Sequence, residues 1–342
     1  MVAVWLGIGG LIVLVGAAEA GVRLARAVGA EAGAAPVADP SVLSDQARRR
    51  IVPDAHRGEW SLPLQSRLVN IDSAGRRVTP QPPVDSDGRK VLMLGGSEMW
   101  GVNASDSATI PGRLAAVLRE AGAAIEVVNL GQPDFVFMQA MMTLLVELSL
   151  REPPSVAVIL TGDVEIEAAI RSGQPGSTLR QPEYQRWLEL GKRSFREELL
   201  GLPRHSLALR AASERRAGQD SSVGGRELCD AVAAHYRNLA DALEALARAR
   251  GFALLLYLAP SAAPSGSDRA GPAAPPSVVA QCRVAIAEAM ADWTGSFAVL
   301  DPAPETPEGG GSLGPSGYRA AAALMAPLVQ NALQATGPER GN

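Results

Sequence analysis

The sequence predicts an α/β fold in which a parallel sheet carries helices on both faces, preceded by an N-terminal transmembrane helix. Two observations predict the sheet: short apolar runs of strand length recur along the chain, and amphipathic stretches of helix length separate them. Strands that alternate with helices in this way form parallel sheets. The third observation is an uncharged apolar run over residues 2–18, which predicts the membrane helix.

Five strands and five helices follow in order along the chain. Each strand is predicted from a short run rich in Val, Ile and Leu that is followed by Gly, Pro or a polar residue. The predicted strands are 91–94, 125–130, 156–160, 252–258 and 297–300. Each helix is predicted from apolar residues three or four positions apart, such as Ile110, Leu114 and Leu118. The predicted helices are 110–121, 137–150, 227–250, 278–293 and 318–335.

Composition limits the classes of function. The 342 residues are 47% hydrophobic, which is enough to build a sizeable core. A formal net charge of −4 and only 4% aromatic residues argue against a nucleic-acid partner. Cys229 and Cys282 lie far apart and have no metal-binding spacing, so we expect no metal and no other cofactor. They either form one disulfide outside the cytosol or remain two small buried hydrophobic residues, and we prefer the second interpretation.

The N-terminal run has two interpretations. Residues 2–18 are long enough to span a thin bilayer, and Glu19 and Arg23 end the run. Residues 18–20 read Ala-Glu-Ala, the form of a signal-peptide cleavage site. Because no basic segment precedes the run, we prefer a retained membrane anchor over residues 1–26.

The rest of the chain divides by composition. We expect a tether rich in Ala, Gly and Pro, an irregular lead-in, one α/β domain and a short tail. The α/β domain is expected to contain a charged helical insertion and a mobile loop. The ranges are 27–50 for the tether, 51–88 for the lead-in, 89–335 for the domain, 182–216 for the insertion, 259–277 for the loop and 336–342 for the tail.

The ends of three predicted strands carry the candidate chemistry. Gly95-Gly96-Ser97 follows the first strand, Gly131 follows the second, and Gly162-Asp163-Val164-Glu165 follows the third. Working sites of parallel sheets lie at the carboxyl ends of the strands. A Ser flanked by Gly at such an end is a candidate nucleophile, with backbone N–H groups available to hold an oxyanion.

In these residues the chain resembles the SGNH or GDSL-like hydrolase family. Residues 91–97 resemble the first conserved sequence block of the family, and residues 127–131 resemble the second. Residues 315–318, which read Pro-Ser-Gly-Tyr, resemble the segment that opens the family's last helix. The resemblance implies a flavodoxin-like, three-layer SGNH-hydrolase-type fold over residues 89–335. The N-terminal span resembles the membrane-anchored branch of the family.

The resemblance also implies roles for particular positions. Ser97 stands where the family has its nucleophile, and Gly96 lies beside it. The Ser97 and Gly131 N–H groups, with an Asn side chain in the third block, would form the oxyanion hole. An Asp and a His would precede the last helix.

Two of the family's sequence blocks depart from the family pattern in this chain. The third block lacks its Asn: Val164 stands at that place, and a shift of two positions puts Gly162 there instead. Gly309 and Ser312 stand where the family has Asp and His. Ser without a base is a weak nucleophile, since general-base assistance contributes about 10²–10⁴-fold and one oxyanion donor about 10²–10³-fold.

Other residues are weaker substitutes for the missing base. His56, His205 and His235 are the three histidines, and a solvated or hydrogen-bonded His is the simpler interpretation of each. Asp163 or Glu165 could accept a proton, but a carboxylate that caps the following helix is the simpler interpretation. Asp301 follows the fifth strand and is interpreted as structural.

Two functions therefore compete. The first is a membrane-anchored, catalytically inactive domain that serves as an accessory or scaffolding subunit, with a protein partner in a membrane complex and a glycan or acyl ligand as an option. The alternative is a serine esterase or O-acyltransferase that acts on cell-envelope carbohydrate with a rearranged base. A nucleotide-binding domain is disfavoured because Gly95-Gly96-Ser97 has no phosphate-loop spacing.

Two arguments disagree about the side of the membrane on which the domain lies. Arg23 and Arg26 follow the span, which by the positive-inside rule places the domain in the cytoplasm. The family resemblance implies the periplasmic side of the inner membrane. We follow the resemblance and expect a single-pass protein anchored through residues 2–18, with its domain in the periplasm.

Overall fold

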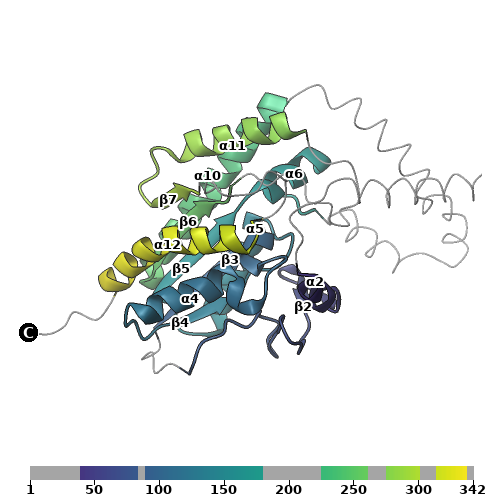
Figure 1. Cartoon of the computed structure of the whole chain (residues 1–342). Coiled ribbons are helices and arrows are strands. Elements are labelled where there is room, and N and C mark those ends of the chain that lie inside the picture. Colours follow the sequence, from purple (N-terminus) through teal and green to yellow (C-terminus); the bar gives the residue numbers. More distant parts are fainter. Residues whose placement is uncertain (1–38, 84–88, 180–224, 261–274, 301–312, 337–342) are drawn as a thin grey trace, which may run out of the picture. The chain divides into compact units, whose positions relative to one another are not determined.

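A five-stranded parallel sheet forms the centre of the structure (Figure 1). The computed structural model describes residues 39–83, 89–179, 225–260, 275–300 and 313–336. The strands are β3 (Lys90–Gly95), β4 (Glu126–Asn129), β5 (Val156–Thr161), β6 (Ala253–Leu258) and β7 (Ser296–Val299). All five predicted strands are confirmed to within one residue at each end, and the sheet order is β4-β3-β5-β6-β7.

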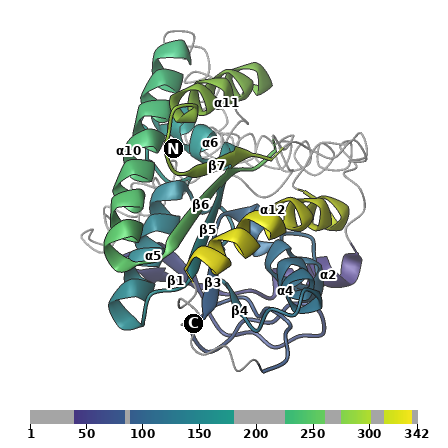
Figure 2. The same cartoon turned by 90° about the vertical axis from the view of Figure 1, so that its left-hand side faces the viewer.

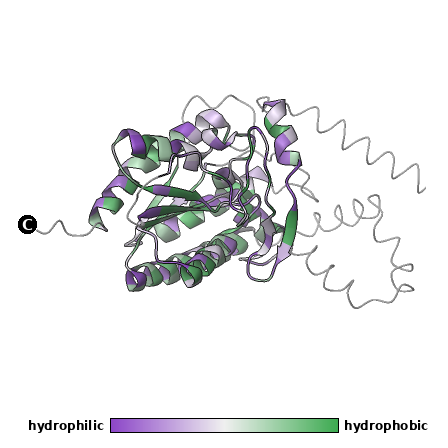
Figure 3. Cartoon of the chain, turned by 90° about the horizontal axis from the view of Figure 1, so that it is seen from below, coloured by the Kyte–Doolittle hydropathy of each residue, from purple (hydrophilic) through white to green (hydrophobic). Residues whose placement is uncertain are grey.

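Helices cover both faces of the sheet, as predicted (Figure 2). On one face lie α4 (Ile110–Glu120) and α12 (Pro315–Ala335). On the other face lie α5 (Phe137–Leu150), α6 (Asp163–Ser172), α10 (Gly225–Arg250) and α11 (Pro276–Met290). The helices expose polar residues and bury apolar ones, which gives their ribbons alternating colours in Figure 3.

The two faces of β3 explain why its sequence is an uninterrupted apolar run. Val91 and Met93 pack among the residues of α4 and α12, whereas Leu92 and Leu94 pack under α5. Alternate residues of a strand point to opposite faces, and here both faces are covered. This burial fixes β3 as an inner strand of the sheet and therefore fixes the place where Ser97 follows it.

The segment before the sheet is more ordered than the sequence predicts. Residues 40–47 form helix α2 (Pro40–Ala47), where we expected a tether, and Val42 of this helix is buried. The expected irregular lead-in contains an antiparallel hairpin of β1 (Ile51–Asp54) and β2 (Gly58–Ser61). Short polar elements of this kind are stabilised by contacts with the rest of the domain, which composition does not reveal.

Arg77 shows how closely the lead-in is joined to the domain. Its side chain is 1% exposed. The guanidinium donates hydrogen bonds to the Asp106 carboxylate at 3.0 Å and to the backbone oxygens of Trp100, Gly101 and Ala104. The lead-in therefore holds the loop that follows α3 (Ser97–Trp100), the short helix that begins at Ser97.

Cys229 and Cys282 form a disulfide, which corrects our preference for two unlinked cysteines. Cys229 lies on α10 and Cys282 on α11, and the two Cα atoms are 4.4 Å apart. Both side chains are fully buried in the core. The preference failed because sequence spacing contains no information on which helices lie side by side.

Several predictions concern residues outside the described ranges. These are the membrane span over residues 2–18, the insertion at 182–216, most of the loop at 259–277 and nearly all of the tail. Among the helices that the structure describes, none combines the length and the apolarity needed to cross a bilayer.

Candidate active site

The candidate site lies where the carboxyl ends of β3, β4 and β5 meet. β3 is the first strand of the sheet along the chain, and it lies between β4 and β5. The chain therefore leaves β3 toward one side for β4 and later crosses to the other side for β5. Such a change of direction opens a crevice at the carboxyl end of the sheet, where ligands of doubly wound folds bind.

Glycines place Ser97 at this point. Gly95 ends β3 with a φ of +146°, and a side chain there would collide with the backbone oxygen of Leu160 on β5. Gly96 passes so close to Phe135 that a Cβ atom would lie 2.8 Å from its backbone oxygen. Ser97 then begins α3 and is 6% exposed. Only a chain without side chains at these two positions can make this turn.

Asp134 and the Ser97 hydroxyl are joined by two hydrogen bonds. The Ser97 hydroxyl donates to Asp134 Oδ1 at 3.4 Å, and the Asp134 backbone N–H donates to Ser97 Oγ at 3.1 Å. The sequence analysis considered no carboxylate in the loop between β4 and α5, and Asp134 lies there as a hydrogen-bond acceptor for the Ser97 hydroxyl.

The loop that carries Asp134 is held in place. Asp134 has a φ of +64°, which Asp tolerates better than most residues. Gln132 accepts the backbone N–H of Phe135, donates its own backbone N–H to Gly95, and accepts a hydrogen bond from Ser61 on β2 with its side chain. The carboxylate of Asp134 is therefore positioned by both the sheet and the lead-in.

Gly131 does not present its N–H as the resemblance implies. That N–H donates to Asn129 Oδ1 at 2.9 Å, and both residues are buried. The Asn129 Nδ2 atom is buried and has no hydrogen-bond partner in the described part of the chain. An oxyanion could receive the Gly131 N–H only if this contact were released.

The residues that follow β5 make hydrogen bonds or packing contacts that stabilise the fold. Gly162 precedes α6, and its N–H donates to Glu165 Oε2 at 3.2 Å, so Glu165 caps its own helix as the simpler interpretation predicts. Asp163 accepts a hydrogen bond from Arg283 on α11 at 2.8 Å. Val164 is buried against Val136 and supplies no donor. Within the described residues, no hydrogen bond joins Glu165 or Asp163 to Ser97.

Glu165 has an unusual electrostatic environment. Burial raises the pKa of its carboxyl to about 7, and the negative charge of Glu98 on α3 adds to this effect, while N–H groups of Gly162 and Phe137 oppose it. Burial disfavours the charged form of an acid. Burial therefore brings the pKa of the Glu165 carboxyl close to neutral pH.

Neither described histidine is bonded to Ser97. His56 is exposed at the turn of the β1–β2 hairpin, and burial lowers the pKa of His235 on α10. His205 and Asp301 lie outside the described residues. Gly309 and Ser312, which occupy the family positions for Asp and His, also lie outside them.

Two features of the site were not predicted. Asp134 follows Gly131-Gln132-Pro133, and a carboxylate three positions after a strand-end Gly was the signal that could have identified it. Arg77 had no local signal, because its partners lie 23–29 residues away along the chain.

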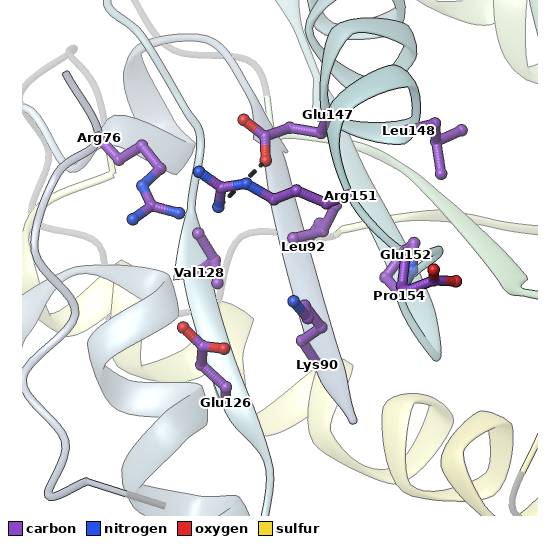
Figure 4. Close-up of a pocket in the computed structure, with 10 residues that line it drawn as sticks. All are labelled: Arg76, Lys90, Leu92, Glu126, Val128, Glu147, Leu148, Arg151, Glu152 and Pro154. Atoms are coloured by element: carbon purple, nitrogen blue, oxygen red, sulfur yellow. Dashed lines mark ion pairs between the residues drawn. The ribbon is translucent and has the colours of Figure 1, made fainter. Parts of the chain in front are cut away.

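A hollow lies at the opposite, amino-terminal edge of the sheet (Figure 4). Its floor is apolar, formed by residues such as Leu92 and Val128, and charged side chains of both signs surround it. Arg151 pairs with Glu147 there at 3.6 Å. In the described part of the chain, no group of three or more His, Cys, Asp or Glu side chains is arranged to hold a metal ion.

Comparisons with known proteins find matches among solved structures and not among family models or curated proteins. No family model matches the sequence, and no curated protein matches it. Similar solved structures include a protein assigned as an arylesterase from Agrobacterium tumefaciens, with 16% identity, a TM-score of 0.43, and coverage of 71% of this chain and 99% of that one. A carbohydrate acetylesterase family member from Sinorhizobium meliloti has 14% identity, a TM-score of 0.39, and coverage of 72% and 99%.

A lipase/acylhydrolase from Enterococcus faecalis has 16% identity, a TM-score of 0.41, and coverage of 74% of this chain and all of that one. The chemistry of the site is therefore argued from this chain's own residues.

Proposed function

We propose that the chain is a slow serine esterase or O-acyltransferase in which Asp134 replaces the missing histidine as proton acceptor. One observation carries this proposal: the Ser97 hydroxyl points to the Asp134 carboxylate at 3.4 Å. Catalytic hydrogen bonds are often long before substrate binds. The substrate class that we propose is an acyl ester of cell-envelope carbohydrate, which rests on the family resemblance.

The proposed reaction has two halves. Ser97 Oγ attacks the ester carbonyl carbon while its proton passes to Asp134, and the leaving alcohol takes that proton as the acyl–oxygen bond breaks. Water, or a second alcohol in the transferase case, then attacks the acylated Ser97 by the reverse path. The Asp134 N–H, which donates to Ser97 Oγ at 3.1 Å, stabilises negative charge on that oxygen.

Slow turnover follows from the same geometry. A carboxylate is a weaker base than imidazole near neutral pH, so proton transfer from Ser97 is less assisted. Val164 supplies no amide donor, and the Gly131 N–H is committed to Asn129. One lost oxyanion donor alone costs about 10²–10³-fold in rate.

A second candidate function has its own observation in support. The Gly131 N–H already donates to Asn129, as expected of a site that no longer stabilises an oxyanion. On this basis the domain would be an accessory or scaffolding subunit of a membrane complex, with Ser97 as a structural residue at the start of α3. Co-purification of a stoichiometric protein partner from mild-detergent membranes would support this candidate.

One experiment separates the two candidates. The full chain is treated with a fluorophosphonate probe and assayed with p-nitrophenyl acetate, beside a Ser97→Ala variant. Labelling and turnover that disappear in the variant support the esterase. If a folded wild-type chain shows neither, the accessory subunit is the better account.

We also propose that the domain lies on the periplasmic side of the inner membrane and is anchored through residues 2–18. The Cys229–Cys282 disulfide supports an oxidising compartment, because disulfides are rare in the cytosol. A reporter fused to the C terminus tests this: activity of a reporter that works only in the periplasm is expected, and activity of a cytoplasmic one contradicts the proposal.

A further inference from the structure

A small pocket lies between the start of α5, helix α6 and helix α10. Its walls include Phe137, Glu165, Ser177, His235 and Leu239. The walls are mostly apolar, but Glu165 and His235 each contribute a polar group. The pocket has room for about one water-sized molecule.

Two buried polar atoms at this pocket have no hydrogen-bond partner among the described residues. They are Glu165 Oε1 and His235 Nε2. The other oxygen of Glu165 accepts the Gly162 N–H, so the carboxyl cannot turn away without uncapping α6. Gly176 lies over the His235 ring, since a Cβ there would be 2.7 Å from Nε2. Buried polar groups are normally paired, and an unpaired one needs an explanation.

We propose that one water molecule in this pocket joins Glu165 to His235, and that the link is a pH-sensitive contact between α6 and α10. The two atoms do not bond each other directly, because neither has a hydrogen-bond partner among the described residues. A water can accept from a protonated carboxyl and donate to a neutral imidazole. Ser177 lines the same pocket and offers a third polar group.

The surroundings of the pocket favour the uncharged forms of both Glu165 and His235. Burial disfavours a negative charge on Glu165, and Glu98 on α3 also repels such a charge, so the pKa of this carboxyl is raised to about 7. Burial lowers the pKa of His235. The other charged or titratable groups nearby are the buried Tyr236 phenol on α10 and Arg283 on α11, which is paired with Asp163.

Ionisation of Glu165 would break this link. A carboxylate cannot donate to the water, and its charge would lie beside apolar groups such as Phe137 with Glu98 nearby. The first turn of α6 carries the Gly162 cap at the same end of the sheet as Ser97. The contact between α6 and α10 therefore weakens as pH rises through about 7.

The stability of the full chain against urea tests the link, measured by tryptophan fluorescence between pH 5 and 8. The pKa of Glu165 is raised from 4.5 to about 7 on folding, so its contribution is present at low pH and lost as pH rises. The folding equilibrium constant then falls by up to about tenfold per pH unit in this window. His235 has a lowered pKa, so it gives a contribution of opposite sign, which is lost as pH falls below its ordinary value of 6.5.

Glu165→Gln keeps a hydrogen-bond donor but cannot ionise, so we expect it to remove the loss of stability between pH 5 and 7. Glu167→Gln is the matched control, because Glu167 lies on the same helix and pairs with Arg171. It is expected to keep the wild-type pH dependence. An unchanged pH dependence in Glu165→Gln overturns the proposal.

A double-mutant cycle tests the link itself, and it also decides the matter if Glu165→Gln fails to fold. Glu165→Ala and His235→Ala are combined at pH 6 and at pH 8. The losses are expected to be less than additive at pH 6, where the water joins the two groups, and additive at pH 8. Additive losses at both pH values overturn the proposal.

Discussion

At the residue scale, the account depends on the pair of Ser97 and Asp134. Removing the carboxylate removes the proton acceptor but leaves the hydroxyl. We expect Asp134→Asn to lower turnover of p-nitrophenyl acetate by about 10²–10⁴-fold, the usual worth of a general base. Asp163→Asn is a matched control, since Asp163 lies at the same end of the sheet but is bonded to Arg283.

Turnover is expected to fall in Asp134→Asn but not in Asp163→Asn. Turnover by Asp163→Asn should stay close to that of the wild type, with thermal unfolding used to check that it is folded. Equal loss in both variants would mean that the carboxylates act through folding, and full activity of Asp134→Asn would remove Asp134 from the mechanism.

The sequence predicts that Ser97 directly follows a buried strand, but it does not predict which side chain bonds to the Ser97 hydroxyl. The place of Ser97 followed from β3 and its two glycines, which are local features. The partner of Ser97 lies 37 residues away in a loop, and its approach depends on how β4 lies beside β3. Asp134 lies away from the positions at which the family motifs have a base, so the motifs do not indicate it.

At the scale of elements, the segment before β3 belongs to the folded domain. Arg77 is buried and bonds to Asp106, so replacing it leaves a buried carboxylate without its charge partner. We expect Arg77→Met to reduce the free energy of unfolding by about 3–5 kcal/mol, the usual cost of breaking a buried ion pair. Urea unfolding of the full chain measures the change.

Arg76→Met is the control for this prediction. Arg76 is the next residue, but its partner Asp72 is partly exposed, and such pairs contribute about 0–1 kcal/mol. A loss in Arg77→Met no larger than in Arg76→Met would contradict the role given to the lead-in.

The strands were predictable and the lead-in was not, for one physical reason. β3 and β5 are buried on both faces, so their sequences must be apolar, whatever surrounds them. Helix α2 buries only Val42 and is held by Gln46, which donates to Gly101. Elements stabilised by a few long-range polar contacts leave little pattern in their own sequence.

At the scale of the whole molecule, the disulfide closes a long segment of chain. Cys229 and Cys282 are 53 residues apart, and a loop of this length corresponds to about 4 kcal/mol of stabilisation through the unfolded state. We expect the double variant Cys229→Ser/Cys282→Ser to unfold at lower urea concentration than the oxidised wild type. Wild-type protein treated with a reductant under unfolding conditions should behave like the variant.

The redox state of the protein in cells is the matching test. Thiol-labelling under denaturing conditions, immediately after the cells are lysed, should leave both cysteines unlabelled if the domain lies in an oxidising compartment. Full labelling of both cysteines would contradict the periplasmic location.

Fluorophosphonate labelling of the full chain, followed by identification of the modified residue, tests the central claim most directly. The account predicts that Ser97 is modified in the wild type and that Asp134→Asn is modified far more slowly. A folded wild-type chain whose Ser97 stays unmodified would contradict it.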